Sequence, residues 1–190
     1  MASRKKLKPP PSPFPWRCVV LSIDPGAKGG AAVWSCGVFM MSWPVRTDAE
    51  KGVVVRYAYD VARRNGLPLV VVFETWRPPA EGFGYMAGRA LAASKASWKT
   101  IVNMGMPFKL GRRTFPKYLE VYAATWQARV LTVGRANRDQ RIEATIDAGN
   151  TYSDEPCIDD NEAAARCIGY WATRAGEVGE LLPEEFRRAA

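Results

Sequence analysis

Residues 18–26, CVVLSIDPG, and residues 29–36, GGAAVWSC, decide the fold of this 190-residue chain. The β-branched apolar run over 18–24 ends on an aspartate before Pro-Gly, a pattern that predicts a buried strand closed by a turn. Residues 29–36 and 37–43, GVFMMSW, predict two more strands joined at Cys36-Gly37. We expect the three strands to form an antiparallel meander.

Helical and strand patterns alternate along the rest of the chain. Apolar residues recur with a helical period over residues 48–65, and Gly66-Leu67-Pro68 ends that pattern. Residues 69–75, LVVVFET, are the most strand-like segment. Weaker patterns predict a helix over 84–103, a strand over 118–122, and helices over 135–148 and 159–173. This order predicts an α/β fold: a mixed five-stranded sheet, three antiparallel strands and then parallel strands, with helices on both faces.

The two ends of the chain differ in composition from the middle. Residues 1–17 hold a basic cluster among five prolines, which predicts a flexible basic, Pro-rich arm that is either a solvated terminus or a DNA contact. Residues 18–175 should form one domain. Residues 176–190 read as a C-terminal tail, either a short helix or a loose end.

Charge and composition exclude several kinds of chemistry. The chain has no histidine, so it cannot use a Ser-His-Asp triad, a histidine zinc site or an imidazole base. The net charge of +8 suggests a polyanionic partner such as nucleic acid. Four single cysteines without a CxxC pair, and no apolar run of about 18 residues, predict reduced thiols in a cytoplasmic protein without a membrane span.

Carboxylates follow two of the predicted strands and precede the last firm helix. Asp24 ends the first strand, Glu74 lies near the end of the fourth, and Asp159-Asp160 begin the helix. Parallel neighbouring strands would place Asp24 and Glu74 about 4.8 Å apart at one edge. Oxygen ligands select Mg²⁺ or Mn²⁺, and two such ions can hydrolyse a phosphodiester without histidine. Alternatively, Asp24 is a turn residue and Asp159-Asp160 cap the helix.

Three motifs resemble those of RuvC-like Holliday junction resolvases, the phage-type crossover junction endodeoxyribonucleases of the RNase H-like superfamily. They are IDPGAKGGAAVW over 23–34, VFETW over 72–76 and DDNEAAARCIGYW over 159–171, and the likeness covers residues 18–173. The resemblance implies a Mg²⁺-dependent homodimer, with Mn²⁺ able to substitute, that cuts four-way DNA junctions in recombination and repair. It also implies that Asp24 and Glu74 are metal ligands, and that the helix over 84–103 lies at the dimer interface.

The third motif departs from the family at Ala164, where the resemblance implies an aspartate. At about 100° per residue, Asp160 lies within about 40° of Ala164 on the helix, so Asp160 is the first choice as a ligand and Asp159 the second. Glu162 lies about 160° away and is expected to face solvent. A cluster short of one carboxylate leaves an alternative function: a catalytically weakened protein that binds junctions without efficient cleavage.

Cations and aromatic residues after Glu74 suggest a DNA-binding surface, because phosphates need positive charge and unpaired bases need stacking partners. Trp98 and Trp126 are expected in the core instead. The segment over 109–117 is either a phosphate-binding loop or a solvated one. The predicted contact residues are Arg77, Phe83, Tyr85, Lys109, Arg112, Arg113, Lys117 and Arg138.

Overall fold

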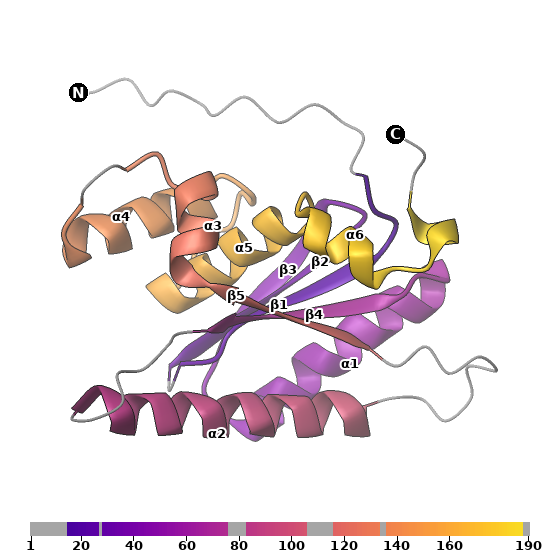
Figure 1. The fold of residues 1–190 in the computed structure, drawn as a ribbon, viewed down its shortest axis with the longest axis horizontal. Coiled ribbons are helices and arrows are strands. Elements are labelled where there is room, and N and C mark those ends of the chain that lie inside the picture. The colour runs from indigo at the N-terminus through magenta and orange to yellow at the C-terminus, as the bar shows by residue number, and fades with distance from the viewer. Residues whose placement is uncertain (1–14, 27, 76–82, 106–115, 134–135, 188–190) are drawn as a thin grey trace.

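A computed structural model describes residues 15–26, 28–75, 83–105, 116–133 and 136–187, with the side chains of 83–85 outside that description. Its strands form one mixed sheet in the order β3-β2-β1-β4-β5 (Figure 1). β2 is antiparallel to β1 and β3, whereas β4 is parallel to β1 and β5. This confirms the predicted sheet. The strands are β1 Val19–Asp24, β2 Gly29–Ser35, β3 Val38–Val45, β4 Leu69–Thr75 and β5 Lys117–Tyr122.

Helices cover both faces of the sheet, as predicted. Helices α1 (Asp48–Asn65) and α2 (Phe83–Met104) lie on one face (Figure 1). The other face carries α3 (Ala123–Val130), α5 (Asp160–Ala172) and α6 (Gly176–Leu181), with α4 (Arg138–Gly149) packed on α5. A short 3-10 turn, Glu184–Phe186, follows. Helix α3 was not predicted, because eight residues give barely two turns of apolar pattern.

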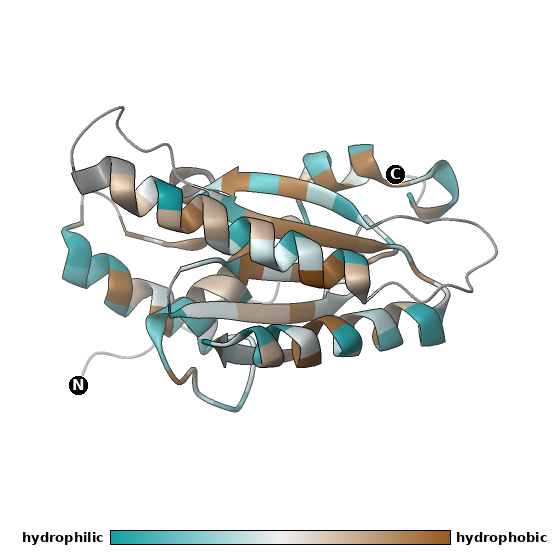
Figure 2. Cartoon of the chain, turned by 90° about the horizontal axis from the view of Figure 1, so that it is seen from below, coloured by the Kyte–Doolittle hydropathy of each residue, from teal (hydrophilic) through white to brown (hydrophobic). Residues whose placement is uncertain are grey.

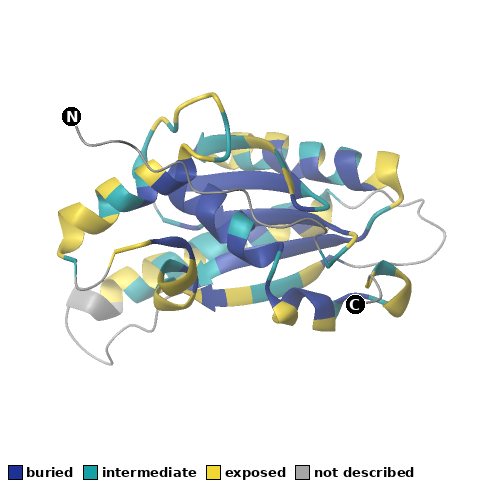
Figure 3. Cartoon of the chain, turned by 90° about the horizontal axis from the view of Figure 1, so that it is seen from above, coloured by how far each residue is buried: buried dark blue, intermediate teal, exposed yellow. Residues whose placement is uncertain are grey.

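Strict alternation along the central strands divides the core into two layers. On β1, Leu21 and Ile23 point toward α1 and α2, where they pack with Phe73 and Trp98. Val20 points to the opposite face and joins the layer beneath α3, α5 and α6. The central strands are accordingly apolar in Figure 2 and almost wholly buried in Figure 3. Trp98 and Trp126 are both buried, as expected.

Segments near both ends of the described chain contact each other and the core. Trp16 packs on Gly179 and donates from its indole nitrogen to the Ala175 carbonyl at 3.0 Å, and it forms an isolated bridge with Arg187. Buried apolar side chains of α6 and the residue after it belong to the core. Trp16, Val178 and Leu182 therefore pack in the same core layer as the strands of the sheet. The rest of the predicted arm, and residues 188–190, lie outside the described residues.

All four cysteines are free, in agreement with the expected reduced thiols. Burial, with a smaller contribution from Cys36, raises the pKa of the Cys18 thiol to about 12, so Cys18 stays protonated near neutral pH. In the described ranges, none of the helices combines the length and the apolar character that a membrane span needs.

Candidate active site at the carboxylate edge of the sheet

Asp24 and Glu74 end adjacent parallel strands in the same register. Ile23 of β1 pairs with Phe73 of β4, so the next residue of each strand is Asp24 and Glu74, respectively. Alternation turns both side chains away from Ile23 and Phe73, toward the face covered by α3 and α5. The two carboxylates therefore lie beside each other at the carboxyl edge of the sheet, as predicted.

Helix α5 brings Asp160 to the same edge by a close approach to β2. A β-carbon at Gly30 would overlap the backbone carbonyl of Asn161, so only glycine lets the first turn of α5 lie this near the strand. Gly30 pairs with Asp24 across the β1–β2 ladder. The packing of α5 on a glycine therefore sets the position of Asp160 relative to Asp24.

A cavity of about 290 Å³ joins the three carboxylates. Asp24, Glu74 and Asp160 line it, together with side chains of α3 and α4 and the methyl group of Ala164. The remaining lining residues are Ala123, Trp126, Gln127, Arg138, Arg141, Ile142 and Thr145. Residues from β1, β4 and three helices thus converge on one site.

Burial raises the pKa of both strand carboxylates. The pKa of Asp24 rises to about 7, first because the group is buried and then because Glu74 and Asp160 are nearby, although the Gly26 amide opposes the shift. Burial also raises the pKa of Glu74, and a hydrogen bond from the Trp126 indole at 2.8 Å opposes that rise. A bound cation would relieve this cost, because it stabilises the ionised carboxylates.

The carboxylate oxygens are the type of ligand that a hard divalent cation such as Mg²⁺ prefers. In the described part of the chain, no three His, Cys, Asp or Glu side chains are grouped closely enough to hold a metal ion by themselves. Mg²⁺ does not require such a cage, because it binds through one or two carboxylates and keeps water or substrate phosphate as its other ligands. The three carboxylates supply oxygen donors in one cavity, and burial followed by the neighbouring carboxylates raises the pKa of Asp24, which matches that mode of binding.

The other two acidic candidates of the third motif are engaged elsewhere. Asp159 caps α5, with one carboxylate oxygen accepting from the Glu162 amide at 2.9 Å and the other from Arg46 at 3.2 Å. Asp159 does not line the cavity. Glu162 was expected to face solvent, and that expectation is wrong: its side chain is buried.

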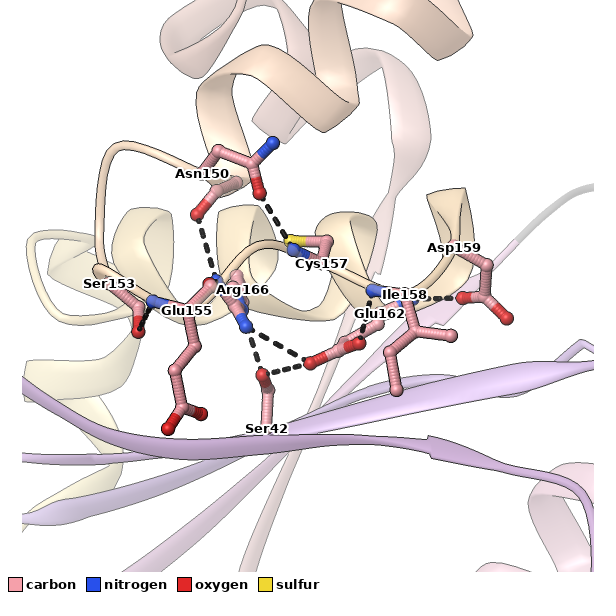
Figure 4. Close-up of polar contacts among 10 residues, drawn as sticks. Ser42, Asn150, Ser153, Glu155, Cys157, Ile158, Asp159, Glu162 and Arg166 are labelled. Carbon is pink, nitrogen blue, oxygen red and sulfur yellow. Dashed lines mark hydrogen bonds and ion pairs between the residues drawn. The ribbon is translucent and has the colours of Figure 1, made fainter.

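Glu162 is buried because β3 and Arg166 offer it partners that a helical wheel does not show. Glu162 accepts hydrogen bonds from Ser42 and from Arg166, the latter at 3.1 Å, and Ser42 in turn accepts from Arg166 at 2.7 Å (Figure 4). Arg166 also donates to the Glu155 carbonyl at 2.9 Å. This buried network ties α5 to β3 and to the segment that precedes the helix.

The predicted DNA-contact residues fall into three groups. Arg138 lines the cavity. Lys117 is exposed and begins β5, four residues before Val121, which pairs with Glu74. At about 3.3 Å per residue this places Lys117 about 13 Å from the carboxylate edge. Outside the described residues or side chains lie Arg77, Phe83, Tyr85, Lys109, Arg112 and Arg113.

Sequence reasoning missed two residues of this site. Trp126 was expected only to pack in the core, yet its indole also binds Glu74. Arg141 lies one helical turn after Arg138 and lines the same cavity. Arg141 could have been predicted from its spacing, because residues three apart on a helix, such as Arg138 and Arg141, lie on the same face. No pattern in the sequence indicates the contact of Trp126, which depends on how α3 packs.

No protein-family model matches the sequence, and no curated protein matches it as a relative. Solved structures do match the fold. Thermus thermophilus RuvC in complex with a Holliday junction superimposes with a TM-score of 0.56 at 12% identity, covering 85% of this chain and 96% of that one. Another structure of the same protein gives 0.49 at 17% identity over the same shares. The chain therefore has the RNase H-like fold that is found in RuvC.

Proposed function

We propose that this protein is a metal-dependent, structure-selective endonuclease that hydrolyses phosphodiester bonds in Holliday junctions or related branched DNA, and so acts in DNA recombination or repair. The observation that carries the proposal is the single cavity shared by Asp24, Glu74 and Asp160. The likeness of the fold to a RuvC structure that holds a Holliday junction supports the choice of substrate. The net charge of +8 suits a DNA ligand.

Asp24, Glu74 and Asp160 would hold Mg²⁺, for which Mn²⁺ could substitute. When bound, the ion supplies positive charge that polarises the phosphate and favours ionisation of water. Trp126 holds one oxygen of Glu74 in place, and the apolar walls at Ile142 and Ala164 restrict the space around the reacting group. A water oxygen bonds to phosphorus and releases a proton to solvent, the bond from phosphorus to the leaving oxygen breaks, and that oxygen takes up a proton from solvent.

We also propose that two copies of the chain act together. A four-way junction has two strands related by a twofold axis, so a symmetric dimer presents one site to each. Helix α2 is the proposed interface, and Met86 and Met104 are exposed on it. Sedimentation of the full chain with and without junction DNA tests this proposal, and a complex with one copy per junction would contradict it.

Cleavage assays on end-labelled DNA test the proposed activity. The purified chain is incubated with a four-way junction, a flap and a linear duplex, in Mg²⁺, in Mn²⁺ and in chelator. We expect cleavage of branched DNA with either ion, none in chelator, and none by Asp24→Asn. Asp60→Asn is the matched control, because Asp60 lies on α1, on the other face of the sheet, in an exposed ion pair.

Two outcomes would contradict the proposal. Cleavage that survives chelation, or that persists in Asp24→Asn, would exclude the metal mechanism. Binding of junctions without cleavage at any metal concentration would favour the alternative function, a junction-binding protein with weakened catalysis. The methyl group of Ala164 in the cavity is the observation that motivates this second function, because it offers no ligand.

A further inference from the structure

Two arginines of α4 line the same cavity as the three carboxylates. Arg138 and Arg141 lie three residues apart on α4, and both line the cavity. Ile142 and Thr145 continue the same helical stripe into it. One wall of the site is therefore acidic and belongs to the sheet and α5, whereas the other is basic and belongs to α4.

Neither guanidinium group has a side-chain partner among the residues that the structure describes. Both side chains are exposed, and no residue of the described part of the chain forms an ion pair or side-chain hydrogen bond with them. Other arginines near this edge do pair: Arg46 binds Asp159 and Arg166 binds Glu162. The arginines also contribute nothing to the raised pKa of Asp24, which burial and neighbouring carboxylates explain. The two charges are thus free to bind a third group between the walls.

The charge of the cavity indicates what that group is. Three ionised carboxylates, one divalent ion and two guanidinium groups leave one positive charge, which matches the single negative charge of a phosphodiester. A second divalent ion would leave a large excess of positive charge, and the position that could add a carboxylate carries the methyl group of Ala164. Arginine suits this task because its planar fork of donors matches two oxygens of one phosphate.

We propose that Arg138 and Arg141 bind the non-bridging oxygens of the phosphodiester to be cut and take the place of a second divalent ion, so that each chain works with one. This inference rests on the proposed function and revises the two ions expected from the sequence. The arginines neutralise the negative charge that grows on those oxygens as water attacks. They touch the substrate, whereas the carboxylates, together with water or a phosphate oxygen, would hold the single ion.

Counting bound ions tests the first half of the inference. Equilibrium dialysis of the full chain against Mn²⁺, with free Mn²⁺ read by electron paramagnetic resonance, should give one ion per chain in the wild type. Asp24→Asn should reduce this number, and Ala164→Asp should raise it to two. Two ions of similar affinity in the wild type would overturn the inference.

Kinetics of arginine variants test the second half. Arg141→Gln should lower kcat for junction cleavage by about 10²-fold, the usual loss for one donor to a developing negative charge, with junction affinity within about threefold and the ion count still one. Arg141→Lys should recover part of kcat, because it restores the charge without the fork. Arg129→Gln is the matched control, since Arg129 is exposed on α3 and does not line the cavity.

The outcomes separate this inference from the function on which it rests. If the wild type cleaves no branched DNA with Mg²⁺ or Mn²⁺, the proposed function fails and the inference fails with it. If the wild type cleaves but Arg141→Gln keeps its kcat, only the inference is overturned. A loss of junction affinity equal to the loss of kcat would also overturn it, because Arg141 would then serve binding alone.

Discussion

The indole Nε1 of Trp126 donates a hydrogen bond to Oε2 of Glu74 at 2.8 Å. Strand β5 ends at Tyr122 and α3 begins at Ala123, so the chain turns at once and packs a buried tryptophan against the carboxyl end of β4. Within the described chain, the other oxygen of Glu74 has no hydrogen-bond partner. The indole fixes one carboxylate oxygen and leaves the other for a ligand.

Trp126→Phe should weaken metal binding by about 10-fold or more, because the residues that orient a metal ligand typically contribute 10–100-fold to affinity. The variant keeps an aromatic ring in the core and removes the N–H donor. Mn²⁺ dialysis measures the change. Trp98→Phe is the control, because Trp98 is equally buried on the opposite face of the sheet; unchanged affinity in Trp126→Phe would contradict the orienting role.

Asp24 should make the metal-free protein less stable as the pH rises. Its pKa is about 7 in the folded chain against an ordinary value of 3.8, so between these pH values the folded state holds a proton that the unfolded state has released. Stability therefore falls between about pH 4 and pH 7. In chelator at pH 8, Asp24→Asn should be more stable than the wild type by a few kcal/mol. This magnitude follows because a change of one pKa unit corresponds to about 1.4 kcal/mol.

Urea unfolding at pH 4 and pH 8 measures the difference in stability between Asp24→Asn and the wild type, which should vanish at the lower pH. Mg²⁺ should stabilise the wild type at pH 8 and have little effect on Asp24→Asn, because a ligand that binds only the folded state adds to its stability. An Asp24→Asn protein that is less stable than the wild type at pH 8 would contradict the origin of the shift.

Gly30→Ala should destabilise the protein by about 1–3 kcal/mol and lower its affinity for metal. The new methyl group would meet backbone atoms of Asn161 and Glu162, which cannot rotate away, and α5 would move off β2 with Asp160. Gly52→Ala is the control: no heavy atom lies within 4 Å of its β-carbon, so alanine in α1 should add about 0.5–1 kcal/mol of stability. An unchanged metal affinity in Gly30→Ala would contradict the role of this close packing in positioning Asp160.

Glu162→Gln should cost about 3–5 kcal/mol of stability, because it leaves the charge of Arg166 buried without its ion-pair partner. Replacing the pair together, as Glu162→Leu with Arg166→Met, should recover much of the loss. Urea unfolding measures both variants. Asp60→Asn breaks an exposed pair with Arg63 and should cost less than about 1 kcal/mol; a similar cost for Glu162→Gln would contradict the importance of burial.

The elements that sequence reasoning predicted are those whose pattern is local. The alternation of β1 and the run of β4 are both strongly patterned, and Asp24 and Glu74 follow directly from where these strands end. The position of Asp160 followed from the helical period of α5. Pairing of β1 with β4 then brought these residues together, because parallel strands share an edge.

Features that depend on packing between distant segments could not be predicted. The burial of Glu162 requires Ser42, which is 120 residues away in the chain. The bond from Trp126 to Glu74 requires a short helix whose pattern spans barely two turns. Arg141 gains its place only when α4 packs on α5, and no periodicity within either helix specifies that contact.

The bridge between Trp16 and Arg187 has a practical consequence for protein engineering. Arg17 donates from its backbone to the Phe186 carbonyl at 2.9 Å, so the first and last described segments run side by side, ahead of β1 and one strand length, about 20 Å, from the carboxylates. A short linker could join these segments, and the Cys36-Gly37 turn could be opened as new ends. Such a circular permutant would keep every wall of the cavity.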